Sequence, residues 1–216
     1  MDAIVAKLND MCDQMPFQTG WHLKEIRSGE TADRMGDIVV PSASVRKIAI
    51  MMAAFRGMNR GRYSLKQRVS IDAKYQNNDS GCFQHLQPDF AISFQDAITM
   101  MIIVSDNTCT GVLVDLLVRD FINDYSKNIG LNNTEIKAGF PPLGEENYAA
   151  YMDVMSPTDA GLILDLILAG SSKSDCASRL GCSTELCALA LAILQRQLLR
   201  TKLPYLLPAE ASVAHK

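Results

Sequence analysis

The stretch PSASVRKIAI, residues 41–50, places Ser44 and Lys47 three residues apart at the start of an apolar run. A serine hydroxyl is a weak nucleophile until a base takes its proton. Residues at positions i and i+3 lie on one face of a helix, so the amine is close to the hydroxyl. If Lys47 is buried, desolvation lowers the pKa of its amine, which can then act as that base. The pair predicts a nucleophilic serine, although a solvated lysine on an amphipathic helix would have the same spacing.

A second polar cluster, Ser105, Asp106 and Asn107, follows the apolar run that ends at Val104. If it faces a cleft, Ser105 relays a proton and Asn107 binds a substrate carbonyl. The same three residues also fit an ordinary helix cap. The final residues, ASVAHK, alternate like the start of a strand and end in Lys216.

The elements that must position these residues are two early strands followed mostly by helices. Helical spacing of apolar residues covers residues 3–15. Residues 20–40 predict a strand, a turn at Ser28 and Gly29, and a weaker strand. Further helices are predicted over residues 44–59, 93–104, 109–125, 157–170 and 183–200, with residues 59–81 mostly loop.

Two of these helices have recognisable start signals. Ser93 followed by Asp96 is an acidic form of the capping box. Ser156 is a predicted N-cap, with Pro157 at the first helical position and Gly170 after the last.

Composition indicates a globular protein and excludes several classes. Of 216 residues, 48% are hydrophobic and 21% charged, and the net charge is −3, which favours neither nucleic acid nor an anionic membrane as a partner. No apolar run is long enough to span a membrane. The first fifteen residues do not resemble a signal peptide, so the chain as written is cytoplasmic, although a mature exported chain would look the same.

The cysteines and histidines do not predict a metal site. The six cysteines form no C-x-x-C pair and are expected to be free thiols, although Cys176 and Cys182 could be bridged in an oxidising compartment. The histidines lack the supporting cysteine or acidic spacing of a metal site. No metal or organic cofactor is expected.

Taken together, the three ordered elements resemble the motifs S-x-x-K, S-D-N and K-T-G of the class A β-lactamase family. The resemblance extends to IRSGETADRMGDIVVPSASVRKIAIMMAAF, FQDAITMMIIVSDNTCTGVLVDLL and MSPTDAGLILDLILAG, and covers nearly the whole chain. It implies an α+β fold, an α/β sandwich of the β-lactamase/transpeptidase type. The expected divisions are residues 1–43, with the N-terminal helix and hairpin, a helical domain over 44–170, and late helices over 171–216.

The resemblance also implies roles for the residues that match the motifs. Ser44 would be the acylated nucleophile and Lys47 its general base. Ser105 would carry the proton to the leaving nitrogen, and Asn107 would bind the substrate amide. Lys216 would be the lysine of K-T-G, which attracts a substrate carboxylate. The substrate would be a β-lactam or a peptide-like amide.

The chain departs from the family pattern at the base that hydrolyses the acyl-enzyme. The family carries E-x-x-L-N in a loop before the late helices, whereas KAGFPPLGEENYAAYMDVM lacks that motif. Glu145 and Glu146 are the glutamates of this loop, but two solvated carboxylates are the better interpretation. Without the base, an acyl-enzyme would form and turn over slowly, as in a penicillin-binding protein.

A second departure is that the chain stops at Lys216, where the family continues with Thr-Gly, further strands and a last helix. Only the hairpin and the start of a third strand of the sheet are therefore expected. Three explanations remain open, namely a chain cut short, a separate C-terminal chain that completes the sheet, and a degenerate relative. The leading hypothesis is a serine hydrolase of the β-lactamase type. The alternatives are a D,D-peptidase, an amidase such as a glutaminase, an esterase, or an inactive sensor.

Overall fold

The computed structural model describes residues 1–76, 78–137, 151–208 and 210–216. Its helices are α1 (Asp2–Asp13), α2 (Lys47–Asn59), α3 (Phe94–Ile103), α4 (Asn107–Leu117), α5 (Arg119–Ile129), α6 (Pro157–Gly170), α7 (Ser174–Arg179) and α8 (Thr184–Gln195). Short 3-10 helices lie at η1 (Ala43–Arg46), η2 (Ala73–Tyr75) and η3 (Phe83–His85). Three antiparallel pairs join β1 (Trp21–Lys24) to β2 (Thr31–Arg34), β3 (Val40–Pro41) to β6 (Val154–Met155), and β4 (Arg68–Ile71) to β5 (Phe90–Ser93). The predicted α+β class is confirmed.

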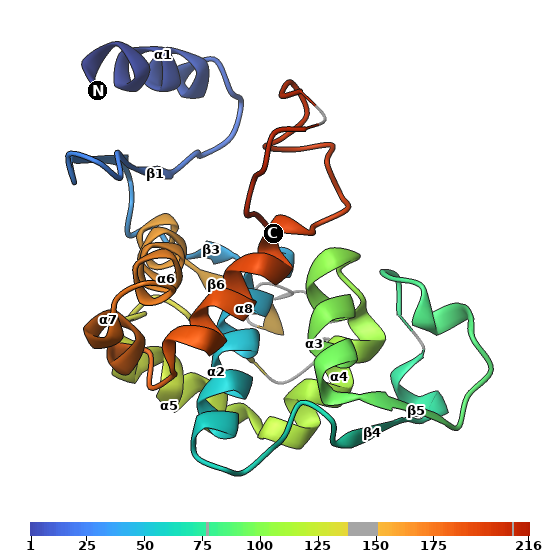
Figure 1. Ribbon diagram of the computed structural model, residues 1–216. Helices are drawn as coiled ribbons and strands as arrows, with labels where there is room; N and C mark the ends of the chain where they lie inside the picture. The colour runs from blue at the N-terminus through green and yellow to red at the C-terminus, as the bar shows by residue number, and fades with distance from the viewer. Residues whose placement is uncertain (77, 138–150, 209) are drawn as a thin grey trace.

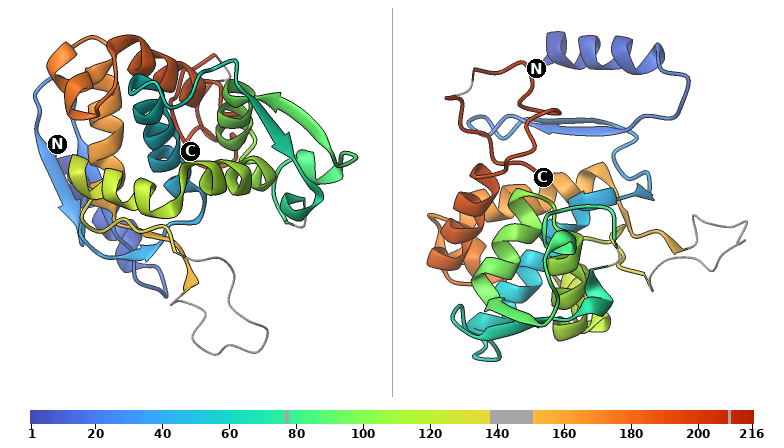
Figure 2. Two further views of the ribbon diagram at one scale, coloured as in Figure 1. Left: turned by 90° about the horizontal axis from the view of Figure 1, so that it is seen from below. Right: turned by 90° about the vertical axis from the view of Figure 1, so that its right-hand side faces the viewer.

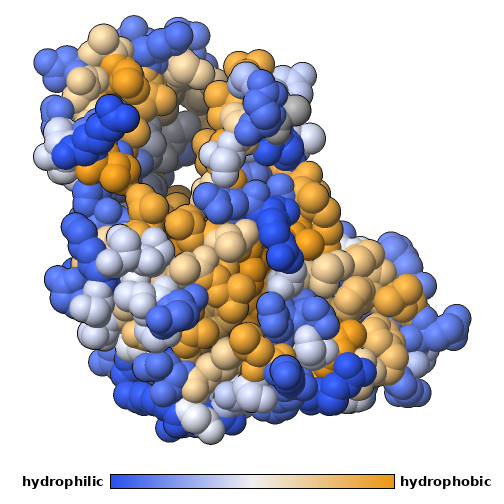
Figure 3. All heavy atoms as spheres, in the orientation of Figure 1, coloured by the Kyte–Doolittle hydropathy of each residue, from blue (hydrophilic) through white to orange (hydrophobic). Residues whose placement is uncertain are grey.

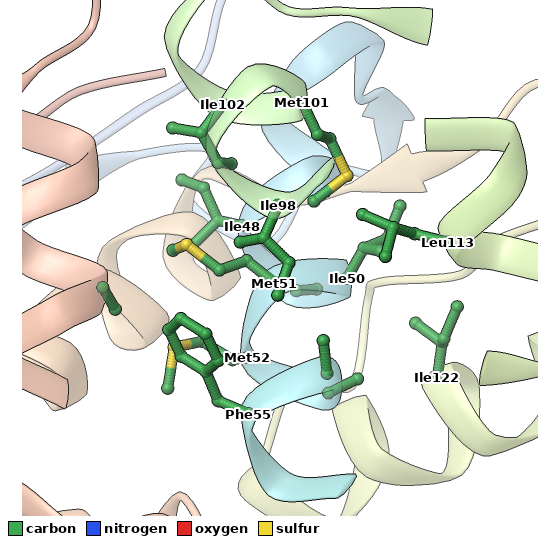
Figure 4. Close-up of a cluster of buried hydrophobic side chains, with 14 of the residues drawn as sticks. Ile48, Ile50, Met51, Met52, Phe55, Ile98, Met101, Ile102, Leu113 and Ile122 are labelled. Carbon is green, nitrogen blue, oxygen red and sulfur yellow. The ribbon is translucent and has the colours of Figure 1, made fainter. Parts of the chain in front are cut away.

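Helix α2 runs through the middle of the helical body, with α3, α4, α5 and α8 against it (Figure 1). Every residue from Lys47 to Phe55 is buried. A helix that meets other helices on all sides has no polar face, which explains why its residues from Ile48 to Phe55 are all apolar. Figure 4 shows its side chains packed against those of α3, with Ile48, Met51, Met52 and Phe55 facing Ile98, Met101 and Ile102. The core therefore holds the first turn of α2 in a fixed position.

A short strand pair positions the residues just before α2. Val40 pairs with Met155 and Pro41 with Val154. Ser42 continues the connection, because its backbone N–H donates to the Asp153 carbonyl at 2.8 Å. The start of α2 is thus joined to the segment that leads into α6.

The predicted hairpin is formed by β1 and β2, with Trp21 opposite Arg34 and Gly29 in the turn at φ +77°. Helix α6 packs on β1. Lys24 Nζ donates to Asp165 Oδ2 of that helix at 2.6 Å. This contact attaches the hairpin to the helical body.

Helix α1 forms where the apolar spacing predicts it, but it buries none of its residues. Its Ile4 and Met11 side chains are 57% and 51% exposed. Together with the hairpin it projects from the helical body, and residues 198–207 project from the same side, at the top of Figure 1 and of the right view of Figure 2. Leu203 and Leu206 of that second projection are also exposed, and apolar residues gather over the face between the projections (Figure 3).

The predicted caps of α3 and α6 are confirmed. The Ser93 side chain accepts from the Asp96 N–H, and the Ser156 side chain accepts from the Asp159 N–H, with Pro157 in the first turn. These bonds satisfy N–H groups that have no partner within the helix.

Three element predictions are wrong in detail. Residues 59–81 contain strand β4, whose alternating pattern rests on only Val69 and Ile71. The helix predicted over 109–125 is two helices, because Val118 at φ +67° breaks it. Helix α8 ends at Gln195, so the apolar residues that follow it are not helical.

The predicted start of a third strand at the chain's last residues is also corrected. Residues 211–216 form no ladder with any described strand, and neither edge of the β1–β2 hairpin pairs with them. The His215 N–H instead donates to the Leu194 carbonyl at 3.3 Å. The division of the chain at residues 43 and 170 stays a prediction.

The six cysteines are free thiols in the structure. Within the described ranges, no helix is both long and apolar enough to cross a membrane.

Candidate active site

A chain of hydrogen bonds joins the two serines to the lysine. The Ser105 hydroxyl donates to Ser44 Oγ at 2.7 Å. Lys47 Nζ donates to Ser105 Oγ at 3.0 Å and to the Ser105 carbonyl at 2.8 Å. The three groups come from positions up to 61 residues apart in the sequence. The structure thus brings together the predicted residues of the first two motifs.

The local backbone explains how Ser44 and Lys47 face the same way. Ser44 lies in η1, a 3-10 helix, in which residues i and i+3 eclipse each other. The Lys47 N–H donates to the Ser44 carbonyl, and Lys47 is the first residue of α2. Ala43, just before the serine, is at φ +44°. Such a conformation is costly for a residue with a Cβ atom, so the surrounding structure must hold it.

Ser105 occupies the break between α3 and α4 at φ +58°. Ala43 and Ser105 thus both have a left-handed backbone, one next to Ser44 and the other within the hydrogen-bonded cluster. The strained conformation turns the Ser105 hydroxyl toward Ser44 while its carbonyl accepts from Lys47. Strained residues cluster at functional sites more often than elsewhere.

The Lys47 amine is fully buried, and its hydrogen-bond partners among the described residues are all neutral oxygens. Burial, followed by the charge of Arg46, lowers its pKa from 10.5 to about 7, although Asp106 and Asp79 oppose this shift. An amine with such a pKa is partly neutral at neutral pH and can accept a proton. Lys47 is therefore a buried lysine and not a solvated one on an amphipathic helix.

Asn107 joins the same cluster. Its Oδ1 accepts from Lys47 Nζ at 2.7 Å, and its Nδ2 donates to Asp79 Oδ1 at 3.0 Å. It also lines a pocket of about 290 Å³ beside Arg46 and Tyr75. The carboxamide therefore borders open space on one side and the lysine on the other.

Asp106, between the two polar residues, is buried and acts as the helix cap. Its Oδ1 accepts from the Cys109 N–H at 3.0 Å, capping α4. Its Oδ2 accepts from the N–H groups of Cys82 and Phe83 at 2.8 and 2.9 Å. The capping and chemical interpretations of this cluster are thus compatible, because the middle residue caps and its neighbours face the lysine.

Lys216 lies near the cluster but is not hydrogen-bonded to either serine. Its Nζ donates to the Ile102 carbonyl at 2.8 Å, three residues before Ser105. Burial and the charge of Lys47 lower its pKa to about 7. The two amines are thus close enough to repel each other when both are charged.

The two loop glutamates, Glu145 and Glu146, lie outside the described residues. On the described side of that loop, Arg46 Nε contacts Asp153 Oδ2 at 2.6 Å, and Asp153 Oδ1 accepts from the Lys137 N–H. Asp153 therefore links the loop's two described ends to the turn that carries Ser44.

The segment from Asn78 to Phe83, predicted as loop up to residue 81, also contacts this cluster and was not predicted to do so. Ser80 Oγ donates to the Ser105 carbonyl at 3.0 Å, and its own carbonyl accepts from the Asn107 N–H at 2.9 Å. The only available signal was the run NNDSG, whose polar residues are equally typical of a solvated turn. Within the described ranges, no group of three or more histidines, cysteines or carboxylates is arranged to hold a metal ion.

A family model described as "Beta-lactamase enzyme family" matches residues 3–216, almost the whole chain. The chain belongs to this family. Its fold is that of serine β-lactamases and penicillin-binding proteins, so the resemblance inferred from the motifs is confirmed.

Solved structures of this β-lactamase fold are similar over most of the chain. A β-lactamase from Sphaerobacter thermophilus is 26% identical, with a TM-score of 0.74 over 88% of this chain and 67% of its own. A structure of PBP-A is 25% identical, with a TM-score of 0.82 over 98% of this chain and 75% of its own. A β-lactamase from Chitinophaga pinensis, 22% identical, shares the fold with a TM-score of 0.83 over 98% of this chain and 77% of its own. No curated protein matches the chain.

Proposed function

We propose that this member of the β-lactamase family is a serine hydrolase that opens β-lactam or related amide bonds through an acyl-serine intermediate. The observation that carries the proposal is the hydrogen-bonded chain from buried Lys47 through Ser105 to Ser44. Partly exposed Ser44 is the member of this chain that a substrate can reach.

In the proposed acylation, Lys47 reacts as the neutral amine. Ser105 passes its proton to Lys47 Nζ and receives the proton of Ser44, whose oxygen attacks the substrate carbonyl. The new ester C–O bond forms as the amide C–N bond breaks, and the proton returns through Ser105 to the leaving nitrogen. Water then hydrolyses the ester, releasing the carboxylic acid and restoring the Ser44 hydroxyl.

Asn107 and Lys216 have binding roles in this proposal. Asn107 Nδ2 has two hydrogens and donates one to Asp79, so the second can donate to a substrate amide carbonyl. Lys216, when protonated, attracts a substrate carboxylate. Its charge also disfavours protonation of Lys47, which keeps the base neutral.

Labelling with a fluorescent penicillin tests the proposal. The wild-type protein is expected to carry a covalent label, and Ser44→Ala is expected to carry none. Ser70→Ala, at an exposed serine on β4, is the matched control and should be labelled like the wild type. A wild-type protein that takes no label, alone or joined to a polypeptide that extends its sheet, would contradict the proposal.

A penicillin-binding activity with slow turnover is the second candidate. The observation that favours it is the absence of E-x-x-L-N from the sequence before α6. One solved structure of similar fold is an acyl-enzyme complex of a PBP-A mutant with penicillin-G. Persistence of the label after free penicillin is removed would favour this activity, whereas rapid loss would favour a lactamase. Turnover of nitrocefin would indicate a lactamase, turnover of glutamine a glutaminase, and turnover of D-alanyl peptides a D,D-peptidase. Tight binding of a ligand without any turnover would indicate a sensor.

We also propose that strands from a further polypeptide complete the sheet begun by the hairpin. Three buried atoms on this side, Thr19 Oγ1, Trp21 Nε1 and His22 Nδ1, find no hydrogen-bond partner among the described residues. A two-stranded sheet with open edges is a marginal structure in water. Addition of a strand-forming polypeptide should raise the unfolding temperature and protect hairpin amides from hydrogen exchange. Unchanged exchange would contradict this proposal.

A further inference from the structure

The Asn107 side chain lies between two groups of opposite charge. Its Oδ1 faces the Lys47 amine at 2.7 Å, and its Nδ2 faces the Asp79 carboxylate at 3.0 Å. An ionised carboxylate only accepts hydrogen bonds, and an ammonium group only donates them. The two neighbours therefore allow a single orientation of the carboxamide.

The segment that carries Asp79 is bonded to the S-D-N turn at several points. Asn78 Nδ2 donates to Thr108 Oγ1 at 2.9 Å on one side of it. On the other side, the Ser80 carbonyl accepts from the Asn107 N–H at 2.9 Å. The Asp79 carboxylate is itself exposed, but its backbone is held in register with Asn107.

We propose that Asp79 is a positioning residue for the acylation reaction, because it holds the Asn107 carboxamide with Nδ2 turned away from Lys47. The effect of Asp79 on acylation rests on the proposed function, whereas its contact with Asn107 does not. Nothing in the motif pattern of the sequence indicates it, since Asp79 lies 28 residues before Asn107 and belongs to no motif.

The Asp79 contact matters most at the moment when Lys47 is neutral. A neutral amine has a lone pair and can accept a hydrogen bond as well as donate one. Lys47 alone would then no longer distinguish Oδ1 from Nδ2 of Asn107. The Asp79 carboxylate still accepts only, so it keeps Nδ2 on its own side and leaves Oδ1 facing the base.

Asp79 also acts on Lys47 by charge. Its carboxylate raises the pKa of Lys47, as Asp106 does, against the larger lowering by burial and by Arg46. The other ionisable groups near the amine are Cys109 and Lys216. Removal of the Asp79 charge should therefore make Lys47 lose its proton at lower pH.

The test compares the wild-type protein with Asp79→Asn, Asp79→Glu and Asp89→Asn. Asparagine at position 79 has nearly the same size but can both donate and accept, so it removes the charge and the orientation together. Asp89→Asn removes one charge at the other end of the loop between β4 and β5, at φ +64°, which asparagine tolerates.

The first readout is NMR titration of the Lys47 Cε resonance and the Asn107 side-chain amide, neither of which needs a substrate. In Asp79→Asn, Lys47 should titrate at lower pH than in the wild type, and the Asn107 amide signal should move with that titration. In the wild type and Asp89→Asn, the Asn107 signal should move much less across the titration of Lys47, because the carboxamide keeps its orientation. Asp79→Glu should restore the wild-type pattern at least in part.

The second readout is the rate of labelling by a fluorescent penicillin across the same pH range. Asp79→Asn should react about threefold to tenfold more slowly at its optimum, with the acidic limb of its pH profile moved to lower pH. If Lys47 and Asn107 titrate identically in the wild type and Asp79→Asn, the positioning role is wrong whether or not the protein reacts. Failure of the proposed function is distinguishable, because it would appear as an unlabelled wild type while the NMR comparison remains readable.

Discussion

The amine of Lys47 donates at 3.0 Å to the hydroxyl of Ser105, and this hydroxyl is itself bonded to the nucleophile candidate Ser44. The contact spans 58 residues of sequence and places a buried amine two hydrogen bonds from a partly exposed serine. Substitutions of Lys47 can therefore be followed by two separate measurements, the rate of labelling and the free energy of unfolding.

Replacement of Lys47 by arginine should abolish most of the acylation while retaining the positive charge. An arginine keeps its proton at any accessible pH and cannot act as a base. We expect the labelling rate with a fluorescent penicillin to fall about 10²–10⁴-fold. A K47R protein that is labelled at the wild-type rate would show that Lys47 is not the base. Lys47→Met is the companion variant, because it fills the same space without a charge.

The pH dependence of stability should also report the buried amine. Burial lowers the folded-state pKa of Lys47 to about 7, against 10.5 ordinarily, so above pH 7 the unfolded chain binds more protons than the folded one. The free energy of unfolding then rises with pH from about 7 toward 10.5 through this group.

The wild type and Lys47→Met should be compared by urea unfolding at pH 7 and pH 9. The difference in the free energy of unfolding reports Lys47 together with its repulsion of Lys216. The buried thiols of Cys109 and Cys182, whose pKa values burial raises, are common to both proteins. The free energy of unfolding of the wild type minus that of Lys47→Met should be larger at pH 9 than at pH 7. A constant difference would mean that the amine is not desolvated.

Asp106 is expected to be structurally essential. It is fully buried and accepts from three backbone N–H groups, two of them in the segment after Asp79. Asp106→Ala leaves these donors without their acceptor and should lower the free energy of unfolding by about 1–3 kcal/mol, with slower labelling of Ser44. Asp96→Ala, at an exposed position in the first turn of α3, is the control and should cost less. Equal losses in the two variants would argue against a special role for Asp106.

The core behind the site should respond strongly to truncation. Phe55 of α2 is completely buried, and Phe55→Ala is expected to lower the free energy of unfolding by about 3–5 kcal/mol. Leu206→Ala, at a side chain that is 89% exposed, should change it by less than about 0.5 kcal/mol. Urea unfolding measures both. A large effect at Leu206 would instead show that the second projection packs against something in solution.

Local patterns in the sequence predicted those parts of the site that depend on neighbouring residues. The spacing of Ser44 and Lys47, the caps at Ser93 and Ser156, and the hairpin turn at Gly29 are each set within a few residues. These features depend on interactions between residues that are close in sequence, so they can be predicted from a single sequence.

The parts that could not be predicted depend on distant contacts. Helix α2 is buried on all sides, so its periodicity gives no preferred face. The bond between Asp79 and Asn107 exists only because a polar loop folds back onto the S-D-N turn. The backbone break at Val118 likewise follows from how α4 and α5 pack, and not from a residue that favours positive φ.

The most direct test of the central claim is peptide mapping by tandem mass spectrometry after incubation with penicillin. The account predicts a single penicilloyl adduct on the Ser44 hydroxyl in the wild-type protein, and its near-complete loss in K47R at equal exposure. An adduct on another residue, or an unchanged yield on Ser44 when the base is replaced, would contradict the claim that buried Lys47 makes this serine reactive.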